Sequence, residues 1–484
     1  IRTLAVIGPS ADAAHVQGGG SAGVTPHYSV TPLEGIRTSC GAEVGVRYER
    51  GCTNHKVLPL LGARLVPSGF QVEYFGSPDL SGDPALTEHS HRIDFFWEGR
   101  IEPKVDPEIH AVRFTGTFAP EENGAYTLGL TSAGRSRLFI DGIELIDNWT
   151  QQTRGDSYFG AGTVEVKAQL EMREGEEREI RIEYCRSNPF IAGIRVGALL
   201  PIPDDLIDRA AAAAAEADAA VVVVGLDDEW ETEGRDRLDM ELPGRQAELV
   251  ERVAAANRNT VVVVNAGSPV AMDWVDRVPA VLDVWYPGQE LGNALADVLF
   301  GEVNPSAKLP TTFPRRIEDN PAYLNYPGEN GEVLYGEGIF VGYRYYDRKR
   351  IEPRFAFGHG LSYTRFSYGE LRLDRDRMPM DGELVASIDV TNSGERAGSE
   401  VVQLYLSDLE CSLARPDQEL KAFDKIALEP GETKTVRFAL TRAALSFYDP
   451  AQEGWVAEPG DFEIRVCSSS RDIRARARFL LEGE

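Results

Sequence analysis

Cysteine is scarce in this sequence, with five residues among 484. The five are widely scattered, they form no CxxC pair, and no paired histidines stand near them. This distribution argues against a zinc site and against a dense disulfide framework. The sequence does not decide whether Cys40 and Cys52 form a disulfide bond. The odd number of cysteines also does not indicate whether the compartment is oxidising or reducing.

Long apolar runs and phosphate-binding motifs are absent as well. No run approaches the roughly 18 residues that cross a bilayer, so we predict no membrane span. Neither GxGxxG nor GxxxxGK followed by Ser or Thr occurs, which argues against a nucleotide site. The run Gly18–Gly20 fits better as a tight loop whose backbone packs close to a partner surface.

Basic residues are outnumbered, with 50 Lys and Arg against 77 Asp and Glu, which gives a formal charge of −27. Such an excess disfavours nucleic acid and anionic membranes and favours neutral or cationic partners. The sequence also begins without an initiator Met and without a signal-peptide pattern. We therefore expect it to begin inside a larger protein, and the localisation stays open.

Two parts of the sequence alternate apolar strands with helices. A strand is expected at Leu4–Ile7, and the pattern resumes after Pro201 with an Ala-rich helix ending near Ala217. Further strands are expected at Ala220–Leu226, Thr260–Asn265 and Ala280–Trp285, and further helices from near Pro243 and over Glu290–Phe300. Apolar strands alternating with helices predict a parallel sheet covered on both faces.

The remaining sequence is rich in β signals. Between residues 70 and 196 we expect strands at Val112–Phe118, Tyr126–Leu130, Arg137–Ile140 and Gly162–Val166, with a hairpin at Asp141-Gly142. A connector rich in Pro, Gly and Tyr follows the second α/β part. The last strands are expected at Glu383–Val390, Glu400–Leu406, Thr433–Leu440 and Asp461–Val466, a spacing typical of an immunoglobulin-like sandwich.

These patterns predict a multidomain α/β plus all-β protein, in agreement with a length that suggests about three domains. An α/β sandwich domain over residues 1–64 and 201–315 is interrupted by a β-sandwich insert over 65–200. A connector over 316–370 leads to an immunoglobulin-like β-sandwich over 371–484.

The chemistry is expected in the segment that follows the strand Ala220–Leu226. Residues 227–237 hold six carboxylates and two arginines, and ligands of open α/β sheets bind at the carboxyl ends of strands. Crowded carboxylates there predict strongly shifted pKa values and a glutamate that acts as a general acid. A solvated acidic loop explains the composition equally simply. The DxDxDG order of a calcium loop is missing.

Several segments resemble glycoside hydrolase family 3, in order and over nearly the whole chain. The second-domain signature of that family is matched by Trp285–Glu290, Ala296–Gly301 and Asn304–Pro310, although glycine is commoner than Ala307 there. The connector and the final domain are matched by Gly342–Tyr346, Phe357–Tyr363, Leu420–Lys425 and Leu428–Glu432. The resemblance implies that the last domain is of the fibronectin type III kind.

The insert resembles the protective-antigen-type module that some members of the family carry, through Phe139–Gly142 and Asp147–Trp149. Such modules lean over the substrate entrance. The resemblance makes Trp149, Tyr158 and Phe159 candidates for a wall that stacks against the leaving group. The alternative for each of them is that its side chain simply packs in the core of the β-sandwich.

The family marks its acid/base loop with Glu-x-Glu-Gly-x-Asp-Arg. This pattern is similar to Glu231, Glu233, Gly234, Asp236 and Arg237 of the sequence. The resemblance implies that Glu233 donates the proton, with a raised pKa, and that Glu231 is the second candidate. Gly234 then allows a sharp turn, and Asp236 and Arg237 hold the loop by ion pairing.

The family's nucleophile is an Asp on a barrel domain, and this sequence has no eightfold βα pattern that builds a barrel. Met272-Asp273-Trp274 looks similar to the nucleophile segment, but it follows the strand Thr260–Asn265 inside the second domain, where the resemblance explains it as structure, and we reject it. The resemblance implies a retaining β-glucosidase without metal or cofactor, in which this chain supplies the acid/base and a barrel domain or chain supplies the nucleophile. A β-xylosidase, an N-acetyl-β-glucosaminidase and a non-catalytic carbohydrate-binding scaffold are the alternatives, and a homo-oligomer stays open.

Overall fold

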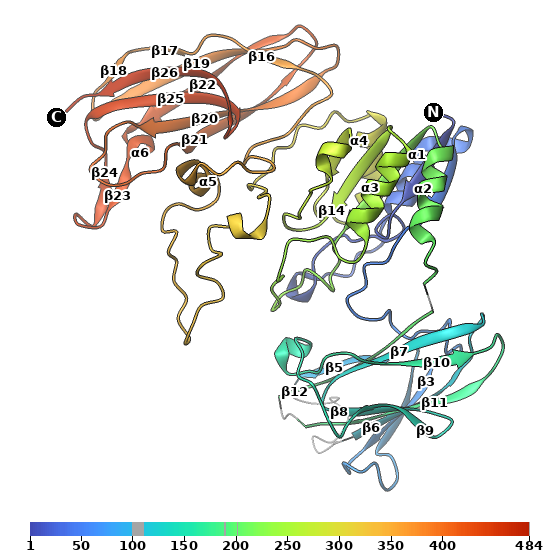
Figure 1. Cartoon of the computed structure of the whole chain (residues 1–484). Helices are drawn as coiled ribbons and strands as arrows, with labels where there is room; N and C mark the ends of the chain where they lie inside the picture. The colour runs from blue at the N-terminus through green and yellow to red at the C-terminus, as the bar shows by residue number, and fades with distance from the viewer. Residues whose placement is uncertain (99–110, 188–189, 201, 484) are drawn as a thin grey trace. The chain divides into compact units, whose positions relative to one another are not determined.

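The computed structural model describes residues 1–98, 111–187, 190–200 and 202–483 (Figure 1). Pro201, after which we expected the α/β pattern to resume, lies outside the described residues. The chain divides into two compact units. The first holds Ile1–His27, Val46–Arg237 and Pro243–Asn265, and the second holds Tyr28–Gly45, Leu238–Leu242 and Ala266–Glu484.

A parallel sheet forms the α/β part of the first unit. Its central strand β13 (Ala219–Gly225) pairs in parallel with β1 (Thr3–Ile7) and with β14 (Thr260–Asn265), and β2 (Gly45–Glu49) lies beyond β1. Most of β13 is buried, as its unbroken apolar sequence predicts for a strand covered on both faces. Its carboxyl end therefore marks one fixed edge, from which residues 227–237 continue.

Two amphipathic helices, α2 (Leu206–Glu216) and α3 (Gln246–Ala256), pack against this sheet. We expected this second helix to begin near Pro243, and it begins at Gln246. The Gln246 side chain binds the end of β13. The Gln246 amide accepts the Gly225 N–H at 2.8 Å and donates to the Gly225 carbonyl at 3.0 Å. These two bonds fix the end of β13.

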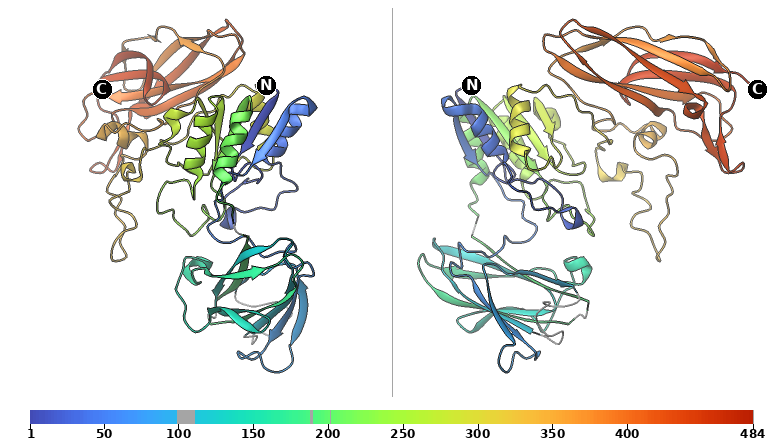
Figure 2. Two further views of the ribbon diagram at one scale, coloured as in Figure 1. Left: turned by 45° about the vertical axis from the view of Figure 1, so that its right-hand side comes forward. Right: turned by 180° about the vertical axis from the view of Figure 1, so that it is seen from behind.

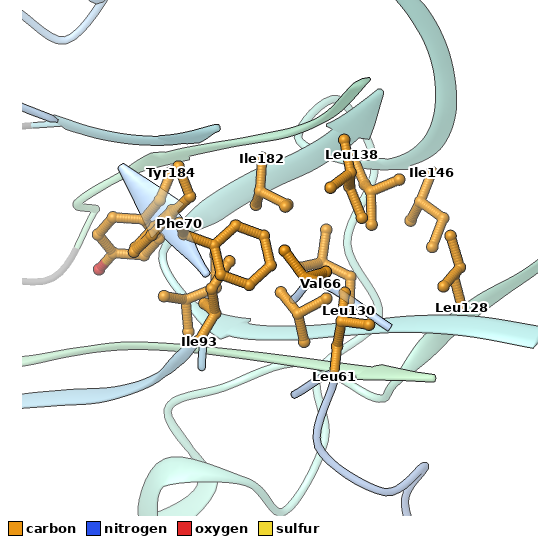
Figure 3. Packing of buried hydrophobic residues seen from close by; sticks show 14 of the residues in the cluster. Leu61, Val66, Phe70, Ile93, Leu128, Leu130, Leu138, Ile146, Ile182 and Tyr184 are labelled. Carbon is orange, nitrogen blue, oxygen red and sulfur yellow. The ribbon is translucent and has the colours of Figure 1, made fainter. Parts of the chain in front are cut away.

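The insert is a sandwich of two antiparallel sheets, with strand orders β4-β3-β6-β11-β8-β9 and β10-β7-β12-β5 (Figures 1 and 2). Buried side chains of both sheets, such as Phe70, Leu130 and Ile182, meet in one core (Figure 3). The strands are β3 (Phe70–Phe75), β4 (Leu86–Ser90), β5 (Asp94–Glu98), β6 (Ala111–Phe118), β7 (Gly124–Ala133), β8 (Arg135–Ile140), β9 (Ile143–Asn148), β10 (Val166–Met172), β11 (Arg178–Cys185) and β12 (Ile191–Leu199).

The predicted hairpin is confirmed, and one predicted strand is wrong. Asp141 and Gly142 join β8 to β9 with φ of 49° and 80°, the left-handed pair that a two-residue turn requires. Gly162, by contrast, starts no strand, because its N–H closes a loop by donating to the Ser157 carbonyl at 2.9 Å. The strand expected at Gly162–Val166 begins only at Val166.

The second unit contains β15 (Ala280–Asp283), a helix pair, the connector and the final sandwich. Helices α1 (Pro32–Cys40) and α4 (Leu291–Phe300) approach so closely that a Cβ on Gly35 would lie 2.1 Å from the Gly292 carbonyl oxygen. The connector carries α5 (Tyr343–Lys349) and otherwise follows a long open path (Figure 1).

The final domain packs two antiparallel sheets around one core. One sheet has the order β16-β19-β17 with β22 against β19, the other has the order β18-β26-β25-β20-β21, and β23 pairs with β24. The elements are β16 (Phe366–Tyr368), β17 (Arg372–Leu373), β18 (Arg377–Met378), β19 (Glu383–Asn392), β20 (Gly398–Asp408), β21 (Glu419–Leu428), β22 (Thr433–Thr441), α6 (Arg442–Leu445), β23 (Phe447–Asp449), β24 (Gly454–Val456), β25 (Gly460–Ser469) and β26 (Asp472–Leu481). The predicted class, α/β plus all-β, is confirmed.

The bridge left open between Cys40 and Cys52 does not form, since both residues are free thiols. Burial raises the pKa of Cys52 to about 12, which keeps this thiol protonated and unreactive. In the described part of the chain, no helix is both long and apolar enough to span a bilayer.

Candidate active site

The segment after β13 starts from a buried carboxylate. Asp227 is 6% exposed, and its carboxylate accepts the Glu229 N–H at 3.0 Å and the Asn54 side-chain amide at 3.3 Å. Its carbonyl accepts the N–H groups of Trp230 at 3.1 Å and Glu231 at 2.9 Å. Burial, helped by the neighbouring charge of Glu229, raises the pKa of Asp227 to about 6. The shifted pKa that the sequence predicts for this segment therefore occurs at Asp227, with burial as its main cause.

Glu229 ties this segment to the insert. Its carboxylate accepts the backbone N–H groups of Lys56 at 3.1 Å and Val57 at 3.3 Å, and it pairs with Arg195 of β12 at 3.3 Å. Burial raises the pKa of Glu229, although these partners oppose the shift. The start of the loop is therefore held by the polypeptide that enters and leaves the insert.

The glycine-rich loop lies directly against the acid/base loop. Gly19 donates its N–H to the Glu231 carbonyl at 2.9 Å and accepts the Glu233 N–H at 3.3 Å, which forms a short parallel bridge opposite Thr232. A Cβ on Gly20, whose φ is +82°, would lie 2.4 Å from the Glu233 Cβ. Only glycine permits this approach, so the expected tight loop is the support on which Glu233 rests.

Glu233, the predicted proton donor, is exposed and held through one oxygen. Its Oε2 accepts the Ser21 N–H at 2.8 Å and also the Ser21 hydroxyl. These bonds stabilise the charged form and lower the pKa of Glu233. The raised pKa that we expected is therefore wrong for this chain alone, because the bonds from Ser21 outweigh the small desolvation of this exposed carboxyl.

Glu231, the second candidate, points into the loop. Its side chain is 12% exposed, and its Oε1 lies 3.7 Å from Nη1 of Arg237. The ion pair that we predicted for Arg237 is therefore made with Glu231. Gly234 adopts the left-handed φ of +77° that the sharp turn was expected to need, and Asp236 is exposed.

An aromatic group of the insert lies beside this turn. A Cβ on Gly234 would lie 3.2 Å from Cδ1 of Phe159, which is 66% exposed. Tyr158 stacks on Phe96 of β5 with ring centroids 6.2 Å apart and 9° between the planes. Phe159 meets Phe96 at the same distance, edge to face. Two of the three candidate stacking residues therefore stand next to the Glu233 loop.

A charged pair holds the aromatic group in place. Asp156, at the start of its loop, lies 3.2 Å from Nζ of Lys56 and 3.8 Å from Nε of Arg235. The Arg235 Nε–H also donates to the Asp156 carbonyl at 3.3 Å. Because Arg235 belongs to the same loop as Glu233, the insert and this loop are joined immediately beside Glu233.

Trp149 lies in another group of side chains. It is half-buried against a small apolar cluster that contains Phe75 and Leu80, and the Arg137 guanidinium lies 4.8 Å from its ring. These contacts are those of ordinary sandwich packing. Of the three residues predicted to form the stacking wall, Tyr158 and Phe159 therefore lie in one group and Trp149 lies in another.

Known proteins match this chain along its whole length. Residues 1–343 match the glycosyl hydrolase family 3 C-terminal domain, and residues 400–470 match the fibronectin type III-like domain. The chain belongs to glycosyl hydrolase family 3. The predicted resemblance is therefore confirmed.

This family 3 chain is 42% identical over 481 residues to a β-glucosidase from Rhizobium radiobacter, covering 98% of the chain and 58% of that protein. The structure of the β-glucosidase from Kluyveromyces marxianus in complex with glucose is similar, with a TM-score of 0.88 and 38% identity over 99% of the chain and 59% of its own. The structure of DesR, a β-glucosidase from Streptomyces venezuelae in complex with D-glucose, is also similar. Its TM-score is 0.69 at 31% identity, and the match covers 99% of this chain and 56% of DesR. The chain thus spans less than two thirds of these relatives.

Sequence reasoning did not assign a role to four residues around the family 3 loop. Ser21 binds Glu233, Asn54 binds the buried Asp227, Arg195 pairs with the half-buried Glu229, and Phe96 completes the aromatic group. The sequence contained a hint for two of these residues. Ser21 directly follows the glycine run Gly18–Gly20, and Phe96 lies in the aromatic run Phe95-Phe96-Trp97. Together these residues present one solvated carboxyl oxygen beside an exposed aromatic ring, an arrangement suited to proton transfer.

Proposed function

We propose that this chain supplies the general acid/base of a retaining β-glucosidase that releases terminal β-D-glucosyl residues. The observation that carries the proposal is the Glu233 carboxylate at the carboxyl end of β13. Ser21 holds its Oε2, and within the described residues Oε1 makes no hydrogen bond. The three similar proteins described above are all named β-glucosidases, which supports glucose as the sugar that is released.

The proposed mechanism needs a second carboxylate, which we assign to a barrel domain outside this chain. That carboxylate attacks the anomeric carbon while Glu233 protonates the departing glycosidic oxygen. Glu233 then takes a proton from a water molecule, whose oxygen attacks the anomeric carbon and displaces the carboxylate bound there, so that glucose leaves with its configuration retained. Such enzymes place the two carboxyl groups about 5–5.5 Å apart, so the partner must reach Glu233 closely. We do not assign this role to Asp273, whose exposed side chain pairs with Arg354.

The two steps need opposite protonation states of Glu233. The Ser21 bonds lower its pKa and therefore favour the carboxylate, which is the form that removes a proton from water. The first step needs the acid. A barrel surface that excludes water and brings a negative nucleophile would raise the pKa of Glu233 for that step.

We assign the leaving-group wall to Tyr158 and Phe159. Phe159 is exposed, stands beside Gly234, and is fixed by Phe96 and by the Asp156 ion pairs. An aromatic face in this position suits the apolar face of a sugar ring or an aromatic aglycone. Trp149 belongs to the packing of the insert.

The proposal is tested with Glu233→Gln in the complete, barrel-containing protein, with Glu231→Gln as the matched control. Cleavage of cellobiose should fall by about 10³-fold or more, because its leaving group needs the proton. Formation of the glycosyl-enzyme from an aryl glucoside with a good leaving group should persist, and burst kinetics would detect it. An unchanged rate on cellobiose would refute the assignment.

Aryl glycoside profiling separates the alternatives. Preference for β-xylosides or N-acetyl-β-glucosaminides over β-glucosides would overturn the proposed sugar within the same chemistry. Sugar binding without turnover of any of the three would identify a non-catalytic scaffold.

A further inference from the structure

The loop that carries Tyr158 and Phe159 has an unusual backbone. It joins β9 to β10 over residues 149–165, and we name it the wall loop. Tyr158 and Phe159 have φ of 51° and 56°, and Gly160 follows with 77°. Residues other than glycine rarely adopt this left-handed conformation, and two in succession persist only where the surrounding structure holds them. The contacts that hold this turn therefore decide where the Phe159 ring lies.

The base of the wall loop is closed inside the insert. Asn148, the last residue of β9, is fully buried, and its side-chain amide donates to the Thr163 hydroxyl at 3.1 Å. The Gly155 N–H donates to the Gly162 carbonyl at 2.9 Å, and the Ser157 hydroxyl donates to the Thr163 carbonyl at 2.9 Å. The two arms of the loop are thus fixed to each other next to the strained turn.

Gly193 of β12 forms the floor under this turn. A Cβ on Gly193 would lie 2.3 Å from Cε1 of Tyr158, so only glycine lets the Tyr158 ring lie directly on the backbone of β12. The Arg154 Nε–H donates to the Gly160 carbonyl at 2.7 Å on the other side of the turn. Tyr158 is therefore held down, whereas Phe159 stays 66% exposed.

Charge ties the turn to the segment that carries the candidate acid/base. The Asp156 carboxylate lies 3.2 Å from Nζ of Lys56 and 3.8 Å from Nε of Arg235. Lys56 is itself fixed, because its N–H donates to the Glu229 carboxylate at 3.1 Å and its Nζ lies 5.6 Å from the centre of the Trp230 ring. Asp156 is thus joined to residues 227–237 both before and after the candidate acid/base.

We infer that Asp156 is a positioning residue for the leaving-group side of the reaction. Its carboxylate holds the strained turn in register with the acid/base segment, so that the Phe159 ring stays beside Gly234 and meets the leaving group. The inference rests on the proposed function, in which Phe159 contacts that group. Without the charge the turn relaxes toward ordinary backbone and the ring moves away. Affinity for a large leaving group should then fall selectively.

Asp156→Asn in the complete, barrel-containing protein tests this role, because it removes the charge and keeps the size. We expect kcat/KM for phenyl β-glucoside to fall about fivefold, mainly through KM. The kcat/KM for methyl β-glucoside, whose leaving group is too small to reach the Phe159 ring, should stay within about twofold. A merely structural role would lower both values alike, and an equal loss on the two substrates would overturn the inference.

The matched control is Asp147→Asn, at a second aspartate that holds a turn of the insert. Asp147 accepts the Trp149 N–H at 2.8 Å and the Thr150 N–H at 2.9 Å. Its loss should leave the ratio of the phenyl to the methyl kcat/KM unchanged. A change in this ratio as large as that in Asp156→Asn would overturn the inference.

Salt gives a second readout of the same contact. The Asp156 side chain is 63% exposed, so its ion pairs are open to screening. Rising ionic strength should move the wild-type ratio of phenyl to methyl kcat/KM toward that of Asp156→Asn and should leave the ratio of the variant in place. Equal responses of the two proteins would contradict the role of the charge.

Phe159→Ala separates this inference from the proposed function. If Asp156 acts through Phe159, the double variant should have no higher KM for phenyl β-glucoside than Phe159→Ala alone. Losses that multiply would refute the positioning role and leave the Glu233 assignment standing. Full activity of Glu233→Gln on cellobiose, together with losses that do not multiply, would refute the acid/base assignment and leave the role of Asp156 standing.

Discussion

At the scale of single residues, the pairing of Ser21 with Glu233 is the central finding. The two residues lie 212 positions apart, and both Ser21 donors converge on one carboxylate oxygen. A charge-assisted pair of this kind orients the carboxyl and sets its proton affinity together. The identity of Glu233 could be read from its motif, but its partner could not, because local spacing does not encode a contact between distant segments.

Ser21→Ala in the complete protein should therefore change the pH profile. Loss of the hydroxyl removes a bond to the charged form, so the pKa of Glu233 rises. The basic limb of kcat/KM, where the acid loses its proton, should therefore move to higher pH. Ser21→Thr, which keeps the hydroxyl, should leave the limb in place, and an equal shift in both variants would contradict the role.

At the scale of elements, apolar runs and turn residues predicted some of the strands, whereas others, such as β3, β11, β12 and β26, were not predicted. β13, β14 and the hairpin at Asp141-Gly142 lie where the sequence indicated. The strand Val166–Met172 was missed although it alternates, because the preceding glycine and threonine suggested an earlier start. Side-chain bonds such as that of Gln246 decide element ends, and no periodicity reveals them.

The pairing of the glycine-rich loop with the acid/base loop gives a prediction at this scale. Gly20→Ala should lower kcat of the complete protein by about tenfold or more, because its Cβ would displace Glu233. Gly41→Ala is the matched control, since Gly41 has a φ of +65° but nothing within 4 Å of its Cβ. That control should cost about 1 kcal/mol of stability and leave kcat unchanged. Equal kcat in the two variants would argue against the pairing.

At the scale of the whole molecule, the sequence holds no eightfold βα pattern, and the chain spans 58% and 59% of the two relatives. The exposure of Glu233 could not be predicted from the sequence, because exposure depends on which surfaces other segments cover.

The isolated 484-residue chain should accordingly show no measurable hydrolysis of aryl β-glucosides. Addition of the barrel, covalently or as a separate chain, should restore turnover, because the attacking carboxylate then reaches the substrate. A continuous assay of aryl glucoside hydrolysis at matched chain concentrations would measure this. Robust turnover by the isolated chain would contradict the division of catalytic groups.

The ties between insert and catalytic loop limit how this enzyme family can be recombined. Arg195 on β12 is the counter-charge of the half-buried Glu229, and Asp156 grips Arg235 two residues from Glu233. A chimera that takes its insert from a relative without these groups would leave the Glu229 carboxylate held by the backbone N–H groups of Lys56 and Val57 but without Arg195. An exchange of inserts between relatives should therefore carry Arg195 and Asp156 along with the module.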